Sequence, residues 1–198
     1  MELIRGLTLL AFVFFGFQII YKQQKIKKKG IQVSTNEPGI KTYFISFLLL
    51  LFFVIFTTEL VSQVFQNSFS LLPAFLQNAF CHSNFLTVIG AITVILSVVS
   101  MHFTLSAFKT SLRFGLNANN LGKLITTGIF SRSRNPFFIS IVLQFLGITL
   151  VFPTLFFATI TFLSVISIHF FILNEEKFML QNYGDEYKKY THQVRRYF

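Results

Sequence analysis

The feature that most constrains this chain is a series of five apolar runs separated by polar or basic loops. An α-helix crosses the hydrocarbon core of a bilayer with about 20 apolar residues, and most of the runs are close to that length. Backbone N–H and C=O groups must bond to each other inside lipid, so such runs form helices. The chain is therefore predicted to be all-α, an integral membrane helical bundle of about five transmembrane helices.

The runs define the predicted order of elements. The spans cover about Leu3–Tyr21, Tyr43–Val61, Phe85–Phe108, Pro136–Phe152 and Thr154–Leu173. Pro153 turns the short fourth span directly into the fifth, so these two are expected to form an antiparallel hairpin. We divide the chain into residues 1–120, with three spans and a basic loop, and residues 121–198, with the hairpin and the tail.

The tail is predicted to form a C-terminal cytoplasmic amphipathic helix. Asn174 is a suitable N-cap for it, and acids follow in the first turn. An apolar and aromatic stripe then recurs at steps of three or four residues, which is the spacing of one helical face. Its members are Met179, Tyr183, Tyr187, Tyr190 and Val194. We expect this face to pack against the protein or the headgroup layer.

Charge is sparse and unevenly placed. Charged residues make up 12% of the chain, about half of what a soluble domain carries, and the formal net charge is +10. Lys and Arg cluster after the first, third and fifth spans, whereas only Arg5 lies elsewhere. This alternation predicts a multi-pass protein with its N-terminus outside and its C-terminus in the cytoplasm. The expected partner of the basic loops is the anionic surface of the lipid bilayer, and not nucleic acid.

Isolated polar residues carry little functional signal. Cys81 is the only cysteine, so neither an intrachain disulfide nor a thiolate metal cluster is predicted, and no metal site is proposed. Glu59 lies near the outer end of the second span, and we interpret it as an acid that reaches water. His102 is expected to have a packing or interfacial role. The sequence contains no glycine-rich nucleotide motif of a conventional type.

The stretch from Gly128 to Phe138 is the most informative. Arg132, Arg134 and Asn135 directly precede Pro136, which suits the first turn of a helix. The N-terminal end of such a helix is positively polarised and binds anions or polar ligands. The alternative interpretation is a plain interfacial anchor of basic residues.

A hairpin would bring this stretch beside a second polar cluster, Glu175-Glu176, at the cytoplasmic interface. Aromatic residues are expected to surround the two clusters, namely Phe130, Phe137, Phe138 and Phe171. One interpretation is a structural ion pair that closes the hairpin. The other is a functional site with one face in lipid and one in water.

These residues carry a resemblance. Gly128-Ile129-Phe130, then Arg134-Asn135-Pro136-Phe137-Phe138, then Glu175-Glu176 with the tail from Tyr183 to Arg196, follow one another in order. The series resembles the isoprenylcysteine carboxyl methyltransferase family and its bacterial and archaeal relatives. That family has a G-x-[YF] element, an R-H-P-x-Y motif and an E-E…F-G-x-E-Y-x-x-Y…V-x-R block. The resemblance covers about Leu121–Arg196.

The resemblance implies a membrane methyltransferase that uses S-adenosyl-L-methionine. Carried over by position, the cofactor-binding residues are Gly122, Lys123, Leu124, Ile125, Phe130, Asn135, Pro136, Phe137 and Phe138. The acids Glu175 and Glu176 would orient substrate or cofactor, and Arg134 would lie beside the reacting centre. The implied acceptor is a lipophilic small molecule or lipid-like compound with a carboxylate, thiol or amine.

The chain also departs from the family pattern. Asn135 replaces the histidine of the motif, Phe138 replaces its tyrosine, and Phe171 stands where the eukaryotic enzymes have a substrate-binding arginine. Recognition of a prenylcysteine carboxylate is therefore not expected. Two alternatives stay open: an NADPH-dependent membrane reductase of the sterol-reductase type, and a non-catalytic membrane protein that retains the fold.

Overall fold

The computed structural model describes residues 1–30, 40–66, 69–109 and 123–197, and in α2 it describes the side chains from residue 43 on. The helices are α1 (Glu2–Lys27), α2 (Ile40–Phe65), α3 (Ala74–Gln77), α4 (Asn84–Ala107), the 3-10 turn η2 (Gly128–Ser131), α5 (Pro136–Val151) and α6 (Leu155–Gln193). Within these residues the chain forms no strand beyond one isolated bridge between Ala79 and Thr154. The all-α prediction is confirmed.

Four helices, α1, α2, α4 and α6, are long and apolar enough to cross a membrane. The fifth apolar helix, α5, has 16 residues and is about 24 Å long at 1.5 Å per residue. The chain is therefore an integral membrane protein with a helical bundle, as predicted.

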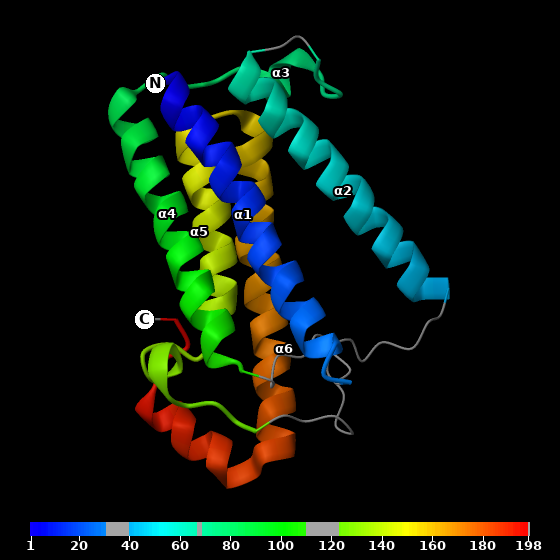
Figure 1. Ribbon diagram of the computed structural model, residues 1–198, viewed down its shortest axis with the longest axis vertical. Coiled ribbons are helices and arrows are strands. Elements are labelled where there is room, and N and C mark those ends of the chain that lie inside the picture. Colours follow the sequence, from blue (N-terminus) through cyan, green and yellow to red (C-terminus); the bar gives the residue numbers. More distant parts are fainter. Residues whose placement is uncertain (31–39, 67–68, 110–122, 198) are drawn as a thin grey trace.

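Helices α1, α4, α5 and α6 run side by side, whereas α2 leans away from them along most of its length (Figure 1). The N-terminus, α3 and the turn between α5 and α6 lie at one end of the bundle. The end of α1, the end of α4, the start of α5 and the last part of α6 lie at the other. The predicted hairpin thus places the start of α5 and the polar half of α6 at the same end.

The closest packing in the bundle joins α4 to α5. A Cβ atom added to Gly90 would lie 2.8 Å from the carbonyl oxygen of Gly147, so the two backbones touch. Small residues are enriched where membrane helices approach closely, because packing rather than the hydrophobic effect holds them together in lipid. Farther along the contact between the same two helices, Ser97 donates to the Gln144 side chain, and Ser140 Oγ lies 2.8 Å from Ser100 Oγ. This contact fixes α5, and with it the position of Pro136.

Helix α6 differs from the prediction at its middle. The expected break after Leu173 and the N-cap at Asn174 are wrong, because the helix runs without interruption from Leu155 past Asn174. Its membrane-spanning part is the apolar half, about 155–173, and the remainder extends beyond it as a polar helix. No glycine or proline interrupts it before Gly184, which has φ +52° and ψ −126°. There the chain turns across the base of the bundle (Figure 1).

The segment after Gly184 buries the predicted stripe. Tyr187, Tyr190 and Val194 form one buried cluster, against which Leu124 and Met179 pack. The expectation that this face packs on the protein is confirmed.

Glu59 does not reach water, contrary to the prediction. Its side chain is 1% exposed, and its carboxylate accepts hydrogen bonds from Ser70 Oγ at 2.6 Å and Gln63 Nε2 at 3.0 Å. Residues after α2 fold back over the end of that helix and bring Ser70 to it. A local reading of the sequence could not foresee this donor, because it comes from the following loop.

Candidate functional site

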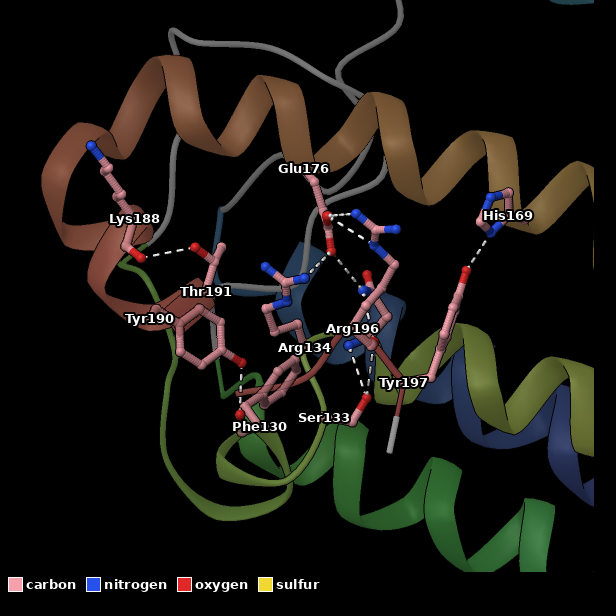
Figure 2. A network of polar contacts seen from close by, with 11 residues as sticks. Phe130, Ser133, Arg134, His169, Glu176, Lys188, Tyr190, Thr191, Arg196 and Tyr197 are labelled. Carbon is pink, nitrogen blue, oxygen red and sulfur yellow. Dashed lines mark hydrogen bonds and ion pairs between the residues drawn. The ribbon is translucent and has the colours of Figure 1, made fainter. Parts of the chain in front are cut away.

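Glu176 is the centre of a polar cluster at the base of the bundle (Figure 2). Its Oε1 pairs with Arg134 Nη2 at 3.3 Å, and its Oε2 accepts from Arg196 Nε at 3.0 Å and Nη2 at 2.9 Å. The Arg134 and Glu176 side chains are only 11% and 12% exposed, so these charges are largely removed from water. A carboxylate in such a setting is stable because two guanidinium groups and several N–H donors surround it.

The start of α5 supplies the second wall of the cluster. Asn135 Nδ2 donates to Glu176 Oε1 at 3.3 Å and to the carbonyl oxygen of Arg196 at 3.1 Å. Its backbone N–H donates to Ser133 Oγ at 3.1 Å, and the Arg134 N–H donates to the carbonyl oxygen of Arg195 at 3.0 Å. Asn135 therefore holds three segments together: the start of α5, the polar half of α6 and the residues after α6.

Local sequence explains why the chain turns here. Gly128 has φ +68° and opens η2, and Pro136 is the first residue of α5, as predicted. Between them Ser133 and Asn135 are buried, so their polar atoms bond to each other and to the tail. This arrangement directs Arg134 towards α6.

The segment after Gly184 packs against η2 beside the cluster. Tyr190 Oη donates to the carbonyl oxygen of Phe130 at 2.6 Å, which joins the segment after Gly184 to η2. Burial raises the pKa of Tyr190 to about 12, so the phenol stays protonated and remains a donor at neutral pH. Burial, and then the nearby Glu176 carboxylate, raises the pKa of Tyr187 well above its usual range.

Glu175 is unlike its neighbour. Within the described part of the chain its half-buried carboxyl group has no hydrogen bond and no ion pair. Burial, and secondarily the negative charge of Glu176, raises the pKa of Glu175 to about 7. The cluster thus contains one carboxylate that is fully engaged and one carboxyl group that titrates near neutral pH.

An apolar groove of about 450 Å³ adjoins this cluster, between α5 and α6. It is lined at its near end by Phe138, Ile172 and Tyr197, and farther along by side chains such as Leu143 and Val165. Ile172 is one helical turn before Glu176, and Tyr197 directly follows Arg196, so the groove ends at the charged residues. Tyr197 Oη lies 2.6 Å from His169 Nδ1 on its wall (Figure 2).

The comparisons with known proteins agree with this architecture. A family model described as phospholipid methyltransferase matches residues 83–186, which is more than half of the chain. The chain belongs to this family. No curated protein matches the chain at a significant level.

Membership of the phospholipid methyltransferase family indicates a membrane methyltransferase. It confirms the resemblance to the isoprenylcysteine carboxyl methyltransferase type. The matched residues begin at the start of α4 and end within the tail, so they include η2, α5, the Glu175-Glu176 pair and the Gly184 turn. The polar cluster therefore lies in the part of the chain that the family shares, apart from Tyr187, Tyr190 and the residues after them.

The structure brings some of the predicted site residues together and separates others. Arg134, Asn135 and Glu176 meet, as the hairpin predicted, and Pro136 starts α5. Leu124 packs on the tail cluster and Ile125 is half-buried, whereas Lys123 is exposed. Gly122 lies outside the described residues. The roles of these residues in cofactor binding stay predictions.

The four aromatic residues do not surround one pocket. The centroid of the Phe108 ring lies 5.0 Å from that of Phe130 and 6.5 Å from that of Phe137. Phe138 instead packs on Phe171 at 5.3 Å, towards α6 and the apolar groove. The Phe137 and Phe138 rings meet edge to face with 5.6 Å between their centroids, so the two contacts are continuous. The predicted single pocket is corrected to a row of ring contacts at the start of α5, which runs from Phe130 through Phe108, Phe137 and Phe138 to Phe171.

Sequence reasoning missed two contributions from the end of the chain. Arg196 completes the environment of Glu176, and Tyr197 forms part of the groove wall. The arginine pair Arg195-Arg196 was visible as part of a family block, but its partner was not. Twenty residues and the turn at Gly184 separate Arg196 from Glu176, and only the path of the chain reveals the contact.

Proposed function

We propose that the chain is an S-adenosyl-L-methionine-dependent methyltransferase that modifies a lipophilic acceptor at the membrane interface. The observation that carries the proposal is the position of the apolar groove beside the Glu176 cluster: its lining residues Ile172 and Tyr197 lie one helical turn before Glu176 and directly after Arg196. An amphiphile with a reactive polar end matches both parts at once. Ligand pockets of about 300–1,000 Å³ that are mainly apolar with a few polar groups are typical of such sites.

The residues present fit the proposed cofactor. S-adenosyl-L-methionine has an amino-acid end with one carboxylate and one ammonium group. The Nε atom of Arg134 is buried and has no hydrogen-bond partner in the described part of the chain, which suits a carboxylate. The Glu175 carboxyl group, which also lacks a bonded partner there, suits an ammonium group. When bound, the cofactor supplies an electrophilic methyl group on a sulfonium centre.

The remaining chemistry belongs to the residues of the chain. Arg134, Asn135 and Arg196 fix Glu176, so this carboxylate is a positioning residue that holds α5, α6 and the tail in one arrangement. Glu175 has the properties of a proton acceptor, because its pKa of about 7 lets it take a proton at neutral pH. A thiol or amine acceptor needs such a base, whereas a carboxylate acceptor does not.

The groove supports a lipophilic acceptor. Its wall is aliphatic and aromatic apart from the Tyr197–His169 pair, so an alkyl or isoprenoid chain lies there without leaving polar groups unpaired. With the chain so held, the polar end of the acceptor lies at the Glu175-Glu176 end. Positioning of this kind supplies much of the acceleration of a displacement reaction. We place this end of the bundle in the cytoplasm, on the strength of the basic loops.

Ligand titration of the purified protein tests the proposal. Binding of S-adenosyl-L-methionine and of its demethylated product, with no response to NADPH, is the expected result. Binding of NADPH alone would instead support a reductase, and binding of neither would support a non-catalytic protein. Turnover is then assayed with radiolabelled cofactor and a panel of lipophilic carboxylates, thiols and amines.

A further inference from the structure

A second polar cavity lies at the end of the bundle opposite the Glu176 cluster. Its volume is about 640 Å³, and its wall comes from α1, the end of α2 and the loop before α4. The residues with free polar groups are Arg5, Gln66, Asn78 and His82. The methyltransferase proposal makes no use of this cavity, because the whole length of the bundle separates the two ends (Figure 1).

Other side chains of the same wall are already engaged. Gln63 Nε2 donates to Glu59 and to the carbonyl oxygen of Gln77, and Gln77 donates to the carbonyl oxygen of Leu72. These bonds fix the wall. By contrast, the side chains of Arg5, Gln66, Asn78 and His82 form no hydrogen bond or ion pair with the described residues.

Arg5 gives the cavity its charge. The guanidinium group lies 5.9 Å from the ring centroid of Phe152, which holds its position, and it faces no acid within ion-pair distance in the described chain. Two acids belong to the same end of the bundle: Glu59, whose oxygens already accept bonds from Ser70 and Gln63, and Glu2 on the first turn of α1. An unpaired, half-buried guanidinium with amide groups beside it binds phosphate well, because its N–H donors match two phosphate oxygens.

An apolar groove of about 600 Å³ adjoins the cavity along α1 and α2. Leu3, Leu7, Leu10 and Phe65 line it together with the acid Glu2, and Gln66 belongs to both the groove and the cavity. Gln66 directly follows α2 and has φ +52°, so the chain turns where the apolar and polar parts meet. A polar, cationic cavity joined to an apolar groove matches an amphiphile that has an anionic head and an apolar chain.

We propose that this end of the bundle binds a phospholipid, with its phosphate at Arg5 and an acyl chain in the groove between α1 and α2. The bound lipid lies between the first turns of α1 and the last turns of α2, at the end of the bundle where these two helices come together beside α3 (Figure 1). The phosphate would form an ion pair with Arg5, the one Lys or Arg residue that lies outside the three basic clusters of the sequence. The lipid acts here as a bound ligand at the far side of the protein from the Glu176 cluster.

Native mass spectrometry of delipidated protein in detergent tests the proposal with three probes: phosphatidylglycerol, diacylglycerol with the same chains, and glycerol phosphate. Phosphatidylglycerol is expected to bind best, since it alone matches both the cavity and the groove. Arg5→Gln should weaken its binding about ten-fold or more, while leaving diacylglycerol unchanged. Lys27→Gln, an exposed basic position at the other end of α1, is the matched control and should have no effect.

Asn78→Asp provides a second test that does not depend on Arg5. Asn78 is exposed, and the substitution keeps its size while adding a negative charge to the wall. It should also weaken phosphatidylglycerol binding about ten-fold or more while the helical circular dichroism stays unchanged. Unchanged phosphatidylglycerol binding in this variant would overturn the phosphate site. Equal affinity for glycerol phosphate, or equal affinity for diacylglycerol, would overturn the assignment to a phospholipid.

Discussion

Arg196 donates from both Nε and Nη2 to the Oε2 atom of Glu176, at 3.0 Å and 2.9 Å. This contact joins the residues after α6 to the middle of that helix, and Arg134 and Asn135 complete it from the start of α5. Because Glu176 receives all of these bonds, the neighbouring Glu175 is left without a bonded partner among the described residues. Two adjacent acids therefore have different physical roles, and single substitutions of each should have different effects on stability and on methyl transfer.

Glu176→Gln should chiefly lower stability. The change keeps the size of the side chain but leaves Arg134 largely buried beside a neutral amide, and removal of one member of a buried pair costs on the order of 3 kcal/mol. A clear fall in the apparent melting temperature in detergent is expected. Glu186→Gln, an exposed acid on the same helix, is the control. Equal melting temperatures for the two variants would contradict a structural role of Glu176.

Glu175→Gln should chiefly lower methyl transfer. Glutamine keeps the shape but can neither accept a proton nor bind an ammonium group as a charge, so a loss of about 10²–10⁴ in rate is expected. Cofactor binding, measured separately, assigns the role: preserved binding places Glu175 on the acceptor side, and lost binding makes it a cofactor ligand. A small effect, similar to that of Glu186→Gln, would contradict a role of Glu175 in the reaction or in cofactor binding.

Stability should fall as the pH rises towards neutrality. Burial and Glu176 raise the pKa of Glu175 from the model-compound value of 4.5 to about 7. Between these values the folded protein binds more protons than the unfolded chain, so its stability decreases as pH increases. The contribution is fully present below about pH 4.5 and is lost as the pH passes about 7. Melting temperatures from pH 5 to pH 8 should show this slope in the wild type and a reduced slope in Glu175→Gln.

Gly184→Ala should disturb the site from a distance. Gly184 has φ +52°, and strain of about 1–3 kcal/mol is expected when a side chain is forced into such a conformation. Relief of the strain moves Tyr187 and Tyr190 away from Glu176 and Phe130. Both the melting temperature and cofactor binding should fall. Gly16→Ala is the control, because a Cβ there meets no atom within 4 Å and alanine favours a helix.

Reporter fusions test the orientation in the membrane. A fusion at Ser70 should report the outside and a fusion at the C-terminus the cytoplasm, because the basic last turn of α1 lies at the end of the bundle that carries the tail. Both reporters on one side would contradict the arrangement of spans. If both reporters lie on the sides opposite to those expected, the Glu176 cluster lies outside.

The sequence by itself determined the class of the fold and the neighbourhood of the site. Apolar runs of bilayer length admit only helices in lipid, and Pro136 and Pro153 limit where α5 begins and ends. From these facts the hairpin follows, and with it the meeting of Arg134 and Asn135 with the Glu175-Glu176 pair. The order of the motifs along the chain was sufficient to indicate the family.

Only the tertiary structure decided which acid is engaged, where α6 turns and what covers Glu59. Glu175 and Glu176 are chemically identical in sequence, and the rotation of α6 against α5 decides that Glu176, and not Glu175, meets Arg134 and Asn135. The path of the tail depends on the φ and ψ angles of Gly184, where the chain turns so that Arg196 contacts Glu176, 20 residues earlier in the sequence. Such contacts depend on the summed geometry of many residues, whereas hydrophobic length and periodicity are local properties of the chain.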